Sequence, residues 1–209
     1  MKDKVLVIAC GAIASELVRI RKLNKWDHID FQCLPPDLHN QPDRIAPEVH
    51  ARIESQASHY RKVFVGYADC GTGGALDKVL ANYEIERIPG THCYEFFAGS
   101  NLFQNLADTE PGSFYLTDFL TRHFERLVIK GLGIDRLPQL KRVYFNNYKR
   151  LVYLAQSDSE KLRVMARKHA DYLGLDYVCY DCGTTPLSNM LKPYLEQVPQ
   201  LSDSKVNDQ

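Results

Sequence analysis

The chain has 209 residues, of which 44% are hydrophobic and 25% are charged, and this predicts one globular domain with a substantial core. Its 26 Lys and Arg residues balance 26 Asp and Glu residues, so no excess charge favours binding to nucleic acid or to a membrane surface. The apolar run near the N-terminus is too short for a signal peptide, and no segment reaches the roughly 20 apolar residues of a membrane span. We therefore expect a cytoplasmic protein whose six cysteines stay reduced.

Strands and helices alternate over the first part of the chain. Apolar, β-branched runs predict strands at residues 4–9, 29–34, 62–67 and 85–88. Helical spacing between them predicts helices at residues 12–23, 46–60 and 76–83. Strands that alternate with helices in this way indicate βαβ crossovers and a parallel sheet.

The middle of the chain, residues 94–148, is rich in aromatic residues and has helical periodicity with few strand signals. It predicts a mostly helical insertion, with helices at 97–106, 117–129 and after Pro138. The aromatic series is expected to form a helical core rather than a cofactor site. Asp118, Arg122 and His123 are expected to be solvated.

The alternating pattern then resumes, with strands predicted at 150–155 and 176–180 and helices at 159–173 and 187–198. The predicted fold is α/β, a doubly wound and mostly parallel sheet with a helical aromatic-rich insertion between the fourth and fifth strands. One domain is expected over residues 1–201, followed by a flexible polar tail at 202–209.

Three of the six cysteines, Cys10, Cys70 and Cys182, directly precede a glycine at the predicted carboxyl end of a strand. In an open parallel sheet the loops at these ends share one face, where ligands bind at the switch point of the topology. A thiol placed before a helix N-terminus is expected to have a lowered pKa, which improves it as a metal ligand or nucleophile. Cys33 and Cys179 lie inside strands and are expected in the core, and Cys182 is expected to be mainly structural.

The adjacent residues His92 and Cys93 follow a Pro-Gly turn at the end of another predicted strand. One of this pair, together with Cys10 and Cys70, makes a set of three protein ligands with an open fourth position. Thiolate and imidazole donors in such a set are typical of a catalytic zinc site. Two other interpretations of these thiols stay open, namely ordinary buried cysteines or a redox or nucleophilic role for Cys70.

A glycine-rich turn follows Cys70 and leads into a helix. Its backbone amides and one hydroxyl belong to Gly71, Thr72, Gly73 and Gly74. Such a turn can cradle a carboxylate or a phosphate as a cofactor-binding element, although its spacing matches neither standard phosphate loop. A tight turn without a ligand is the alternative.

Two further residues are candidate acid–base or orienting groups. His39 lies in a loop with three prolines, directly after the second predicted strand, and a rigid loop can present a histidine as a base or ligand. A surface or capping histidine is the alternative. Glu95 lies beside His92 and Cys93 and can serve as an acid or base or orient a histidine.

Several sequence blocks occur in a fixed order along the chain. They are ACGA with EL (9–12, 16–17), LP with LHN (34–35, 38–40), YADCGTGG with LD (67–77), HCYEF (92–96), PG with FYLTDFL (111–120), GLG with DR (131–140) and YF with RLVYLAQ (144–156). Together they resemble a bacterial and archaeal family classed as a domain of unknown function. The chain departs from that pattern at Asp181-Cys182-Gly183, where the family has a Gly-Tyr-Gly-like turn.

The resemblance implies a genomic setting rather than an activity, since genes of this family often lie beside corrinoid-dependent methyltransferases. It implies a metal-binding enzyme or accessory in corrinoid-linked one-carbon metabolism, with a small molecule or a corrinoid protein as partner and corrinoid contact as a weak implication. Association into a homo-oligomer stays open. The rival hypothesis is a non-catalytic module that holds an anionic or corrinoid ligand over the glycine-rich turn.

Overall fold

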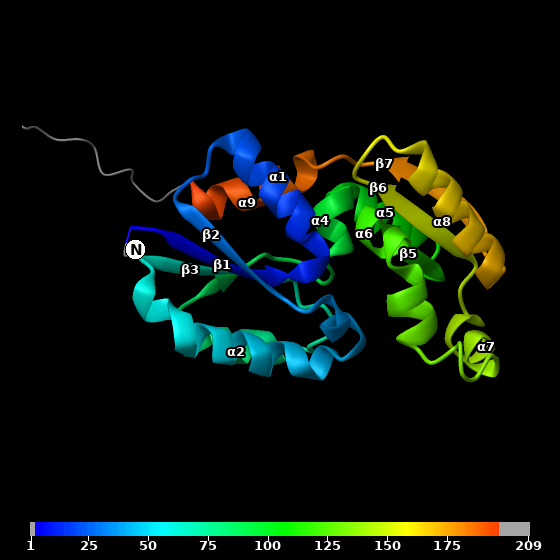
Figure 1. The fold of residues 1–209 in the computed structure, drawn as a ribbon, viewed down its shortest axis with the longest axis horizontal. Helices are drawn as coiled ribbons and strands as arrows, with labels where there is room; N and C mark the ends of the chain where they lie inside the picture. Colours follow the sequence, from blue (N-terminus) through cyan, green and yellow to red (C-terminus); the bar gives the residue numbers. More distant parts are fainter. Residues whose placement is uncertain (1–2, 197–209) are drawn as a thin grey trace, which may run out of the picture.

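The computed structural model describes residues 3–196 and has two parallel sheets that lie side by side (Figure 1). The first sheet has the strand order β2-β1-β3-β4, and the second has the order β5-β6-β7. The predicted α/β class with parallel strands is confirmed, whereas the strands are divided between two sheets. The predicted tail at 202–209 lies outside the described residues.

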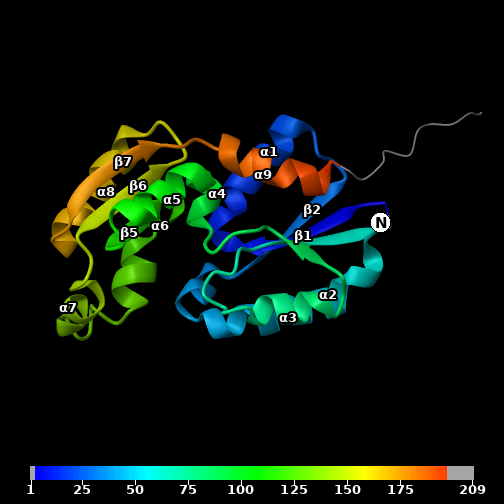
Figure 2. The same ribbon diagram turned by 180° about the vertical axis from the view of Figure 1, so that it is seen from behind.

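The first sheet is formed by β1 (Val5–Cys10), β2 (Ile29–Leu34), β3 (Lys62–Gly66) and the short β4 (Glu86–Arg87). All six residues of β1 are buried, as expected of a central parallel strand that is covered on both faces. Two helices, α1 (Ala14–Asn24) and α9 (Thr185–Leu195), lie on one face, and α2 (Ile45–Gln56) and α3 (Ala75–Ala81) lie on the other (Figures 1 and 2). The chain therefore returns through α9 to the sheet with which it began.

Short helical turns lie in the connections between these strands. They are the 3-10 turns η1 (Gly11–Ile13), η2 (Pro36–Asn40), η3 (Pro42–Arg44) and η4 (Ala57–His59). Of these, η1 and η2 begin directly at the carboxyl ends of β1 and β2 and so lie at the edge where ligands bind in parallel sheets. Cys33, predicted in the core, is exposed on β2, because β2 is the edge strand of its sheet.

The second sheet is formed by β5 (Ser113–Thr117), β6 (Arg150–Ala155) and β7 (Asp176–Asp181). Strand β5 lies inside the segment that is predicted to be mostly helical, and the sequence patterns do not predict a strand there. The helices expected around it are present as α4 (Tyr94–Ala98), α5 (Ser100–Thr109), α6 (Asp118–Arg122), the π-helix η5 (Glu125–Lys130) and α7 (Gln139–Phe145). Helix α8 (Glu160–Leu173) connects β6 to β7.

Strand β6 joins the two hydrophobic cores because its side chains alternate between them. Leu151 and Tyr153 pack into the core of the second sheet. Val152 and Leu154 point the other way and belong to the core that also contains β1 and α9. The two sheets thus share a buried layer of side chains. A cavity lies between the same two sheets.

Local signals explain where the helices near this layer begin and end. The hydroxyl of Ser159 accepts a hydrogen bond from the amide of Leu162 and caps α8, and Thr117 caps α6 in the same way. Gly174 ends α8 in the left-handed conformation, with φ of 77°. Between residues 3 and 196, the structure has no helix with the length and apolar character needed to span a membrane.

Candidate metal centre

The carboxyl ends of β1 and β3 form the switch point of the first sheet, because β2 lies on one side of β1 and β3 on the other. Cys10 is the last residue of β1, and Cys70 lies in the turn after β3. Both are buried, with exposed fractions of 8% and 9%. Both thiols therefore lie at the carboxyl ends of strands, as their positions in the sequence predict.

The loop that carries His39 lies tightly against this edge. A Cβ on Gly11 would lie 2.8 Å from the carbonyl oxygen of Leu34 and 3.1 Å from Cδ of Pro36, so only glycine permits the close approach of η2 to the end of β1. From the other side, Nδ2 of Asn40 donates a hydrogen bond of 2.9 Å to the carbonyl oxygen of Leu127 in η5. The loop that carries His39 therefore contacts the end of β1 on one side and η5 on the other.

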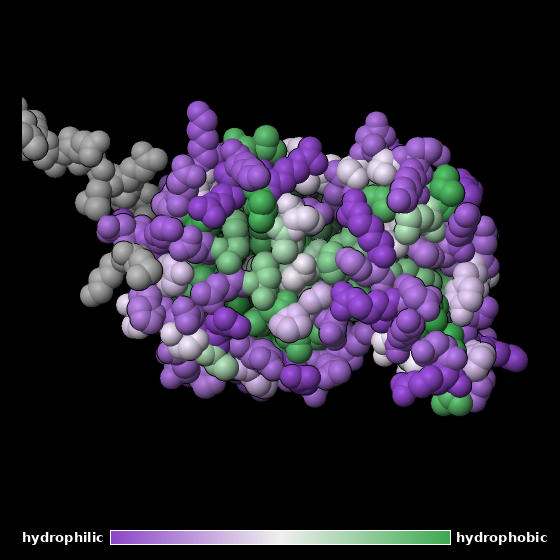
Figure 3. Space-filling model, viewed as in Figure 1, coloured by the Kyte–Doolittle hydropathy of each residue, from purple (hydrophilic) through white to green (hydrophobic). Residues whose placement is uncertain are grey.

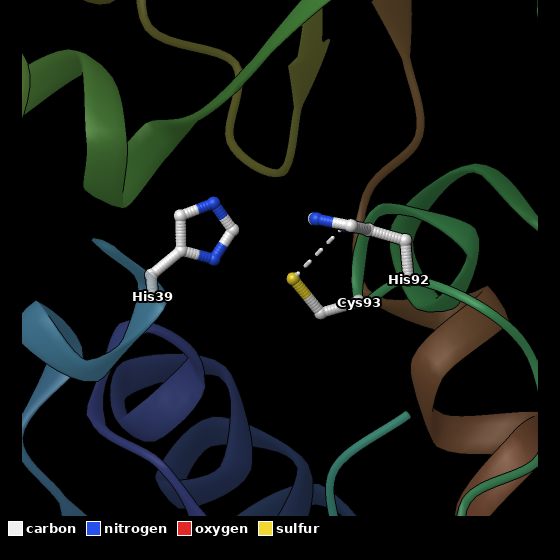
Figure 4. A group of neighbouring side chains, drawn as sticks. All are labelled: His39, His92 and Cys93. Carbon is white, nitrogen blue, oxygen red and sulfur yellow. Dashed lines mark hydrogen bonds between the residues drawn. The ribbon is translucent and has the colours of Figure 1, made fainter. Parts of the chain in front are cut away.

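His39, His92 and Cys93 form a compact donor cluster at this edge (Figure 4). One ligand atom from each side chain lies within 4.8 Å of the other two. The Cys93 sulfur lies 3.5 Å from Nδ1 of His92, and the two imidazole rings meet edge to face with centroids 5.3 Å apart. We call these three residues the His/Cys cluster.

Both imidazoles of the His/Cys cluster are biased toward the neutral form. Burial, reinforced by the nearby His39 ring, lowers the pKa of His92 to about 4. Desolvation by the surrounding protein also lowers the pKa of His39. Nδ1 of His92 accepts a weak hydrogen bond of 3.3 Å from the amide of Tyr94, so its lone pair points toward that amide and the Cys93 sulfur. Neutral imidazoles with available lone pairs are the form that binds metals.

The thiols behind the His/Cys cluster differ in their electrostatics. A hydrogen bond with Cys93 lowers the pKa of Cys70 and, together with burial, raises the pKa of Cys93 well above its ordinary value. Burial raises the pKa of Cys10 to about 11, so the expectation of a lowered pKa is wrong for Cys10. Desolvation exceeds the effect of the amide of Ala12, which donates to the Cys10 sulfur at 3.4 Å.

The structure therefore brings together a different set of side chains from the one that was predicted. His92 and Cys93 both belong to the His/Cys cluster, although only one of the pair was expected to do so. The third member is His39, whereas Cys10 and Cys70 lie outside the cluster. Cys182 directly follows β7 of the second sheet, whereas Cys10 and Cys70 lie at the ends of strands of the first sheet.

The glycine-rich turn holds a carboxylate that belongs to the chain itself. Asp69 accepts hydrogen bonds from the hydroxyl of Thr72 at 2.8 Å and from the amides of Gly73 and Gly74 at 3.2 and 2.8 Å. These amides and that of Gly71 lower the pKa of Asp69. An external anion would have to displace Asp69 from these donors, and the cofactor-binding role of Gly71, Thr72, Gly73 and Gly74 stays a prediction.

Glu95 lies on α4, one turn beyond the His/Cys cluster. Its carboxylate packs against Gly90. Glu95 is not among the described residues that line the neighbouring cavity. An acid–base role for Glu95 at the His/Cys cluster therefore gains no geometric support, and the role stays a prediction.

A cavity of about 270 Å³ adjoins the His/Cys cluster and lies between the two sheets. The first sheet contributes the wall with polar atoms, which includes Cys10, His39, Asn40, Cys93 and Tyr94. The second sheet contributes an apolar wall, which includes Phe114, Phe119, Leu120, Val128 and Phe145. Much of the aromatic series that was expected only to fill a helical core therefore lines a ligand-sized space.

Sequence reasoning also missed two features beside the cavity. Tyr94 stacks on His92 with ring centroids 4.2 Å apart, and it is buried enough that its pKa is raised well above the ordinary value. Asp118, expected in solvent, is 2% exposed. Its carboxylate accepts hydrogen bonds from the Tyr153 hydroxyl at 2.6 Å, the Gln156 amide at 3.0 Å and the Ser157 hydroxyl.

The comparisons with known proteins give one match. A family model described as "Protein of unknown function (DUF1638)" matches residues 33–191, which includes all three members of the His/Cys cluster. No curated protein and no solved structure matches the chain.

Proposed function

Since the chain belongs to the family described as "Protein of unknown function (DUF1638)", which brings no activity with it, we propose a function from the site: the protein binds one divalent metal ion, zinc before others, through His39, His92 and Cys93. The observation that carries the proposal is the convergence of three ligand atoms within 4.8 Å of one another. Two of these ligands, His39 and Cys93, also line the cavity between the sheets, so a fourth ligand of the metal would be supplied from beside that cavity.

The spacing of the donors supports this proposal. Zinc bonds of about 2.0 Å to nitrogen and 2.3 Å to sulfur, at tetrahedral angles, place the two donors about 3.5 Å apart. The Cys93 sulfur and Nδ1 of His92 are 3.5 Å apart. A metal would thus replace the weak Tyr94 amide contact at Nδ1.

The donor types favour zinc among common divalent ions. Two imidazoles and one thiolate suit a borderline-soft cation, while calcium and magnesium prefer oxygen ligands. Three protein ligands with one open position are typical of catalytic rather than structural zinc. Within this proposal Cys70 is an orienting group, because it hydrogen-bonds to Cys93 as partners behind a metal ligand commonly do.

The implied corrinoid-linked role is compatible with this site only from outside the cavity. About 270 Å³ is slightly below the roughly 300–1,000 Å³ of pockets for drug-sized ligands, and a corrin macrocycle is larger than such ligands. We therefore propose a metal-dependent enzyme or accessory that acts on a small molecule, with any corrinoid carried by a partner protein.

A second candidate is thiol chemistry at Cys70. It is supported by the lowered pKa of that thiol and by a left-handed backbone, with φ of 48°, because strained residues cluster at functional sites. Burial of Cys70, at 9% exposure, disfavours attack on a bulky substrate. Alkylation by iodoacetamide below pH 7 at Cys70 would support this candidate, and an ordinary alkylation profile would remove it.

The metal proposal is tested by titrating the metal-free protein with zinc against a chromophoric chelator. We expect one equivalent to bind, and Cys93→Ser or His39→Gln to weaken binding by at least about tenfold, since even partners behind the ligands contribute about 10–100-fold. Cys33→Ser, at an exposed thiol on β2, is the matched control and should bind zinc as the parent does. Absence of stoichiometric zinc, or parental affinity in Cys93→Ser, would remove the proposal.

A further inference from the structure

The cavity beside the His/Cys cluster has walls of unequal chemistry. Every wall residue contributed by β5, α6, η5 and α7 is apolar or aromatic except Thr117. The described residues that line the cavity include no Asp, Glu, Lys or Arg. A ligand that carries a full charge into this space would therefore be desolvated without a partner, which is unfavourable by several kcal/mol.

On these grounds we propose that the cavity binds a small, apolar, ring-sized molecule that is uncharged when free and presents one thiol to the metal ion. This inference rests on the proposed metal site and adds to it the chemical class of the ligand. Size supports a single ring with a short arm, since apolar cavities of about 150 Å³ hold benzene and this one measures about 270 Å³.

Charge supports a donor that loses one proton on binding. A dication held by one thiolate and two neutral imidazoles keeps a single positive charge, which faces a wall without charged side chains. One monoanionic donor neutralises that charge, and a soft thiolate suits a metal that already has a sulfur ligand. In this step the S–H bond breaks, the proton leaves to solvent, and a metal–sulfur bond forms without any change in oxidation state.

The mouth of the cavity fits entry of such a ligand. Tyr144 and Tyr148 line the cavity and are 45% and 37% exposed, so aromatic surface continues from solvent into the interior. Figure 3 shows one face of the molecule, on which hydrophobic side chains are visible between hydrophilic ones over both sheets. Amphipathic tyrosines at an entrance present an apolar ring to the ligand and a hydroxyl to water.

The experiment measures binding of benzyl mercaptan and toluene by calorimetry to the metal-free and zinc-loaded protein. Benzyl mercaptan should bind at least tenfold more tightly to the zinc-loaded form, and toluene should bind both forms within twofold. In the zinc-loaded protein, 4-methylbenzyl mercaptan should bind at least tenfold more tightly than its 4-carboxylate counterpart. Equal binding of these last two compounds would overturn the inference.

Variants locate the ligand. Ala12→Leu adds bulk inside the cavity and should weaken toluene binding at least tenfold, while Ala81→Leu, at an exposed position on α3, should leave it unchanged. Val128→Phe fills the cavity from the opposite wall if Ala12→Leu does not fold. Toluene binding that survives in both filling variants would overturn the inference.

The results for the metal and the ligand are separable. If zinc binds but benzyl mercaptan gains nothing from it, the thiol inference fails and the proposed metal site stands. If zinc does not bind but Ala12→Leu abolishes toluene binding, the metal site fails and with it the thiol donor, whereas the apolar cavity stands.

Discussion

The hydrogen bond between Asn40 and Leu127 is the contact whose loss should most directly disturb the His/Cys cluster without touching it. Asn40→Ala removes the donor that holds the His39 loop against η5 at 2.9 Å. A hydrogen bond of this kind contributes about 1 kcal/mol net, so the fraction of molecules with His39 in place falls by up to about fivefold. Because apparent affinity scales with the competent fraction, the apparent dissociation constant for zinc should rise about fivefold. Chelator competition at pH 7 measures this constant.

The matched control is Asp37→Ala on the same loop. Asp37 forms an ion pair of 2.9 Å with Arg126 of η5, but both side chains are more than half exposed, and such pairs contribute little. Gly131→Ala should reproduce the effect of Asn40→Ala, because a Cβ there would collide with Leu127 and lie 2.8 Å from Nδ2 of Asn40. Unchanged zinc affinity in Asn40→Ala, or an equal loss in Asp37→Ala, would refute the anchoring role.

Three further predictions concern stability and protons. Asp118→Ala should lower the free energy of unfolding by about 2–4 kcal/mol, because two buried donors and one part-buried donor lose their acceptor and each unsatisfied buried donor is unfavourable by about 1–3 kcal/mol; Asp108→Ala on the surface should change it by less than about 0.5 kcal/mol in chemical denaturation, and similar losses in the two would contradict this. The pKa of His92 falls from 6.5 to about 4 on folding. The free energy of unfolding of the metal-free protein should therefore be independent of His92 above pH 6.5 and should fall by up to about 3 kcal/mol as the pH falls toward 4. His92→Gln should flatten that part of the plot of unfolding free energy against pH, and an unaltered plot would count against the shift. Zinc affinity should rise about tenfold per pH unit between roughly pH 6 and 8, because Cys93 must lose its proton while His92 is already neutral; calorimetry in two buffers counts that proton, and a count of zero would be inconsistent with thiolate ligation.

The parallel α/β character follows from patterns that sequence shows well. The apolar run of β1 predicted a buried central strand, and the Ser159 cap and Gly174 stop bounded α8. The division into two sheets was not predictable in this way, because long-range pairing decides it rather than local periodicity. Strand β5 was missed since its aromatic residues and its short length fit a helix as well as a strand.

The site was predictable in position but not in side-chain direction. Strand ends located Cys10, Cys70 and the His92-Cys93 turn correctly, since parallel strands bring these ends to one edge. No pattern reveals that Cys10 is buried against the Ala12 amide or that η2 turns His39 toward Cys93. In contrast, the occupied glycine-rich turn had a signal: an Asp before such a turn commonly accepts hydrogen bonds from the following backbone.

X-ray absorption at the zinc edge, on the protein loaded with one equivalent of zinc, measures directly which atoms bind the metal. We predict one sulfur at about 2.3 Å and two imidazole nitrogens at about 2.0 Å, with the sulfur signal lost in Cys93→Ser and kept in Cys70→Ser. Two or more sulfur ligands would indicate that Cys10 or Cys70 binds the metal, as the sequence alone predicts. A zinc ion without a sulfur ligand would contradict the proposed centre altogether.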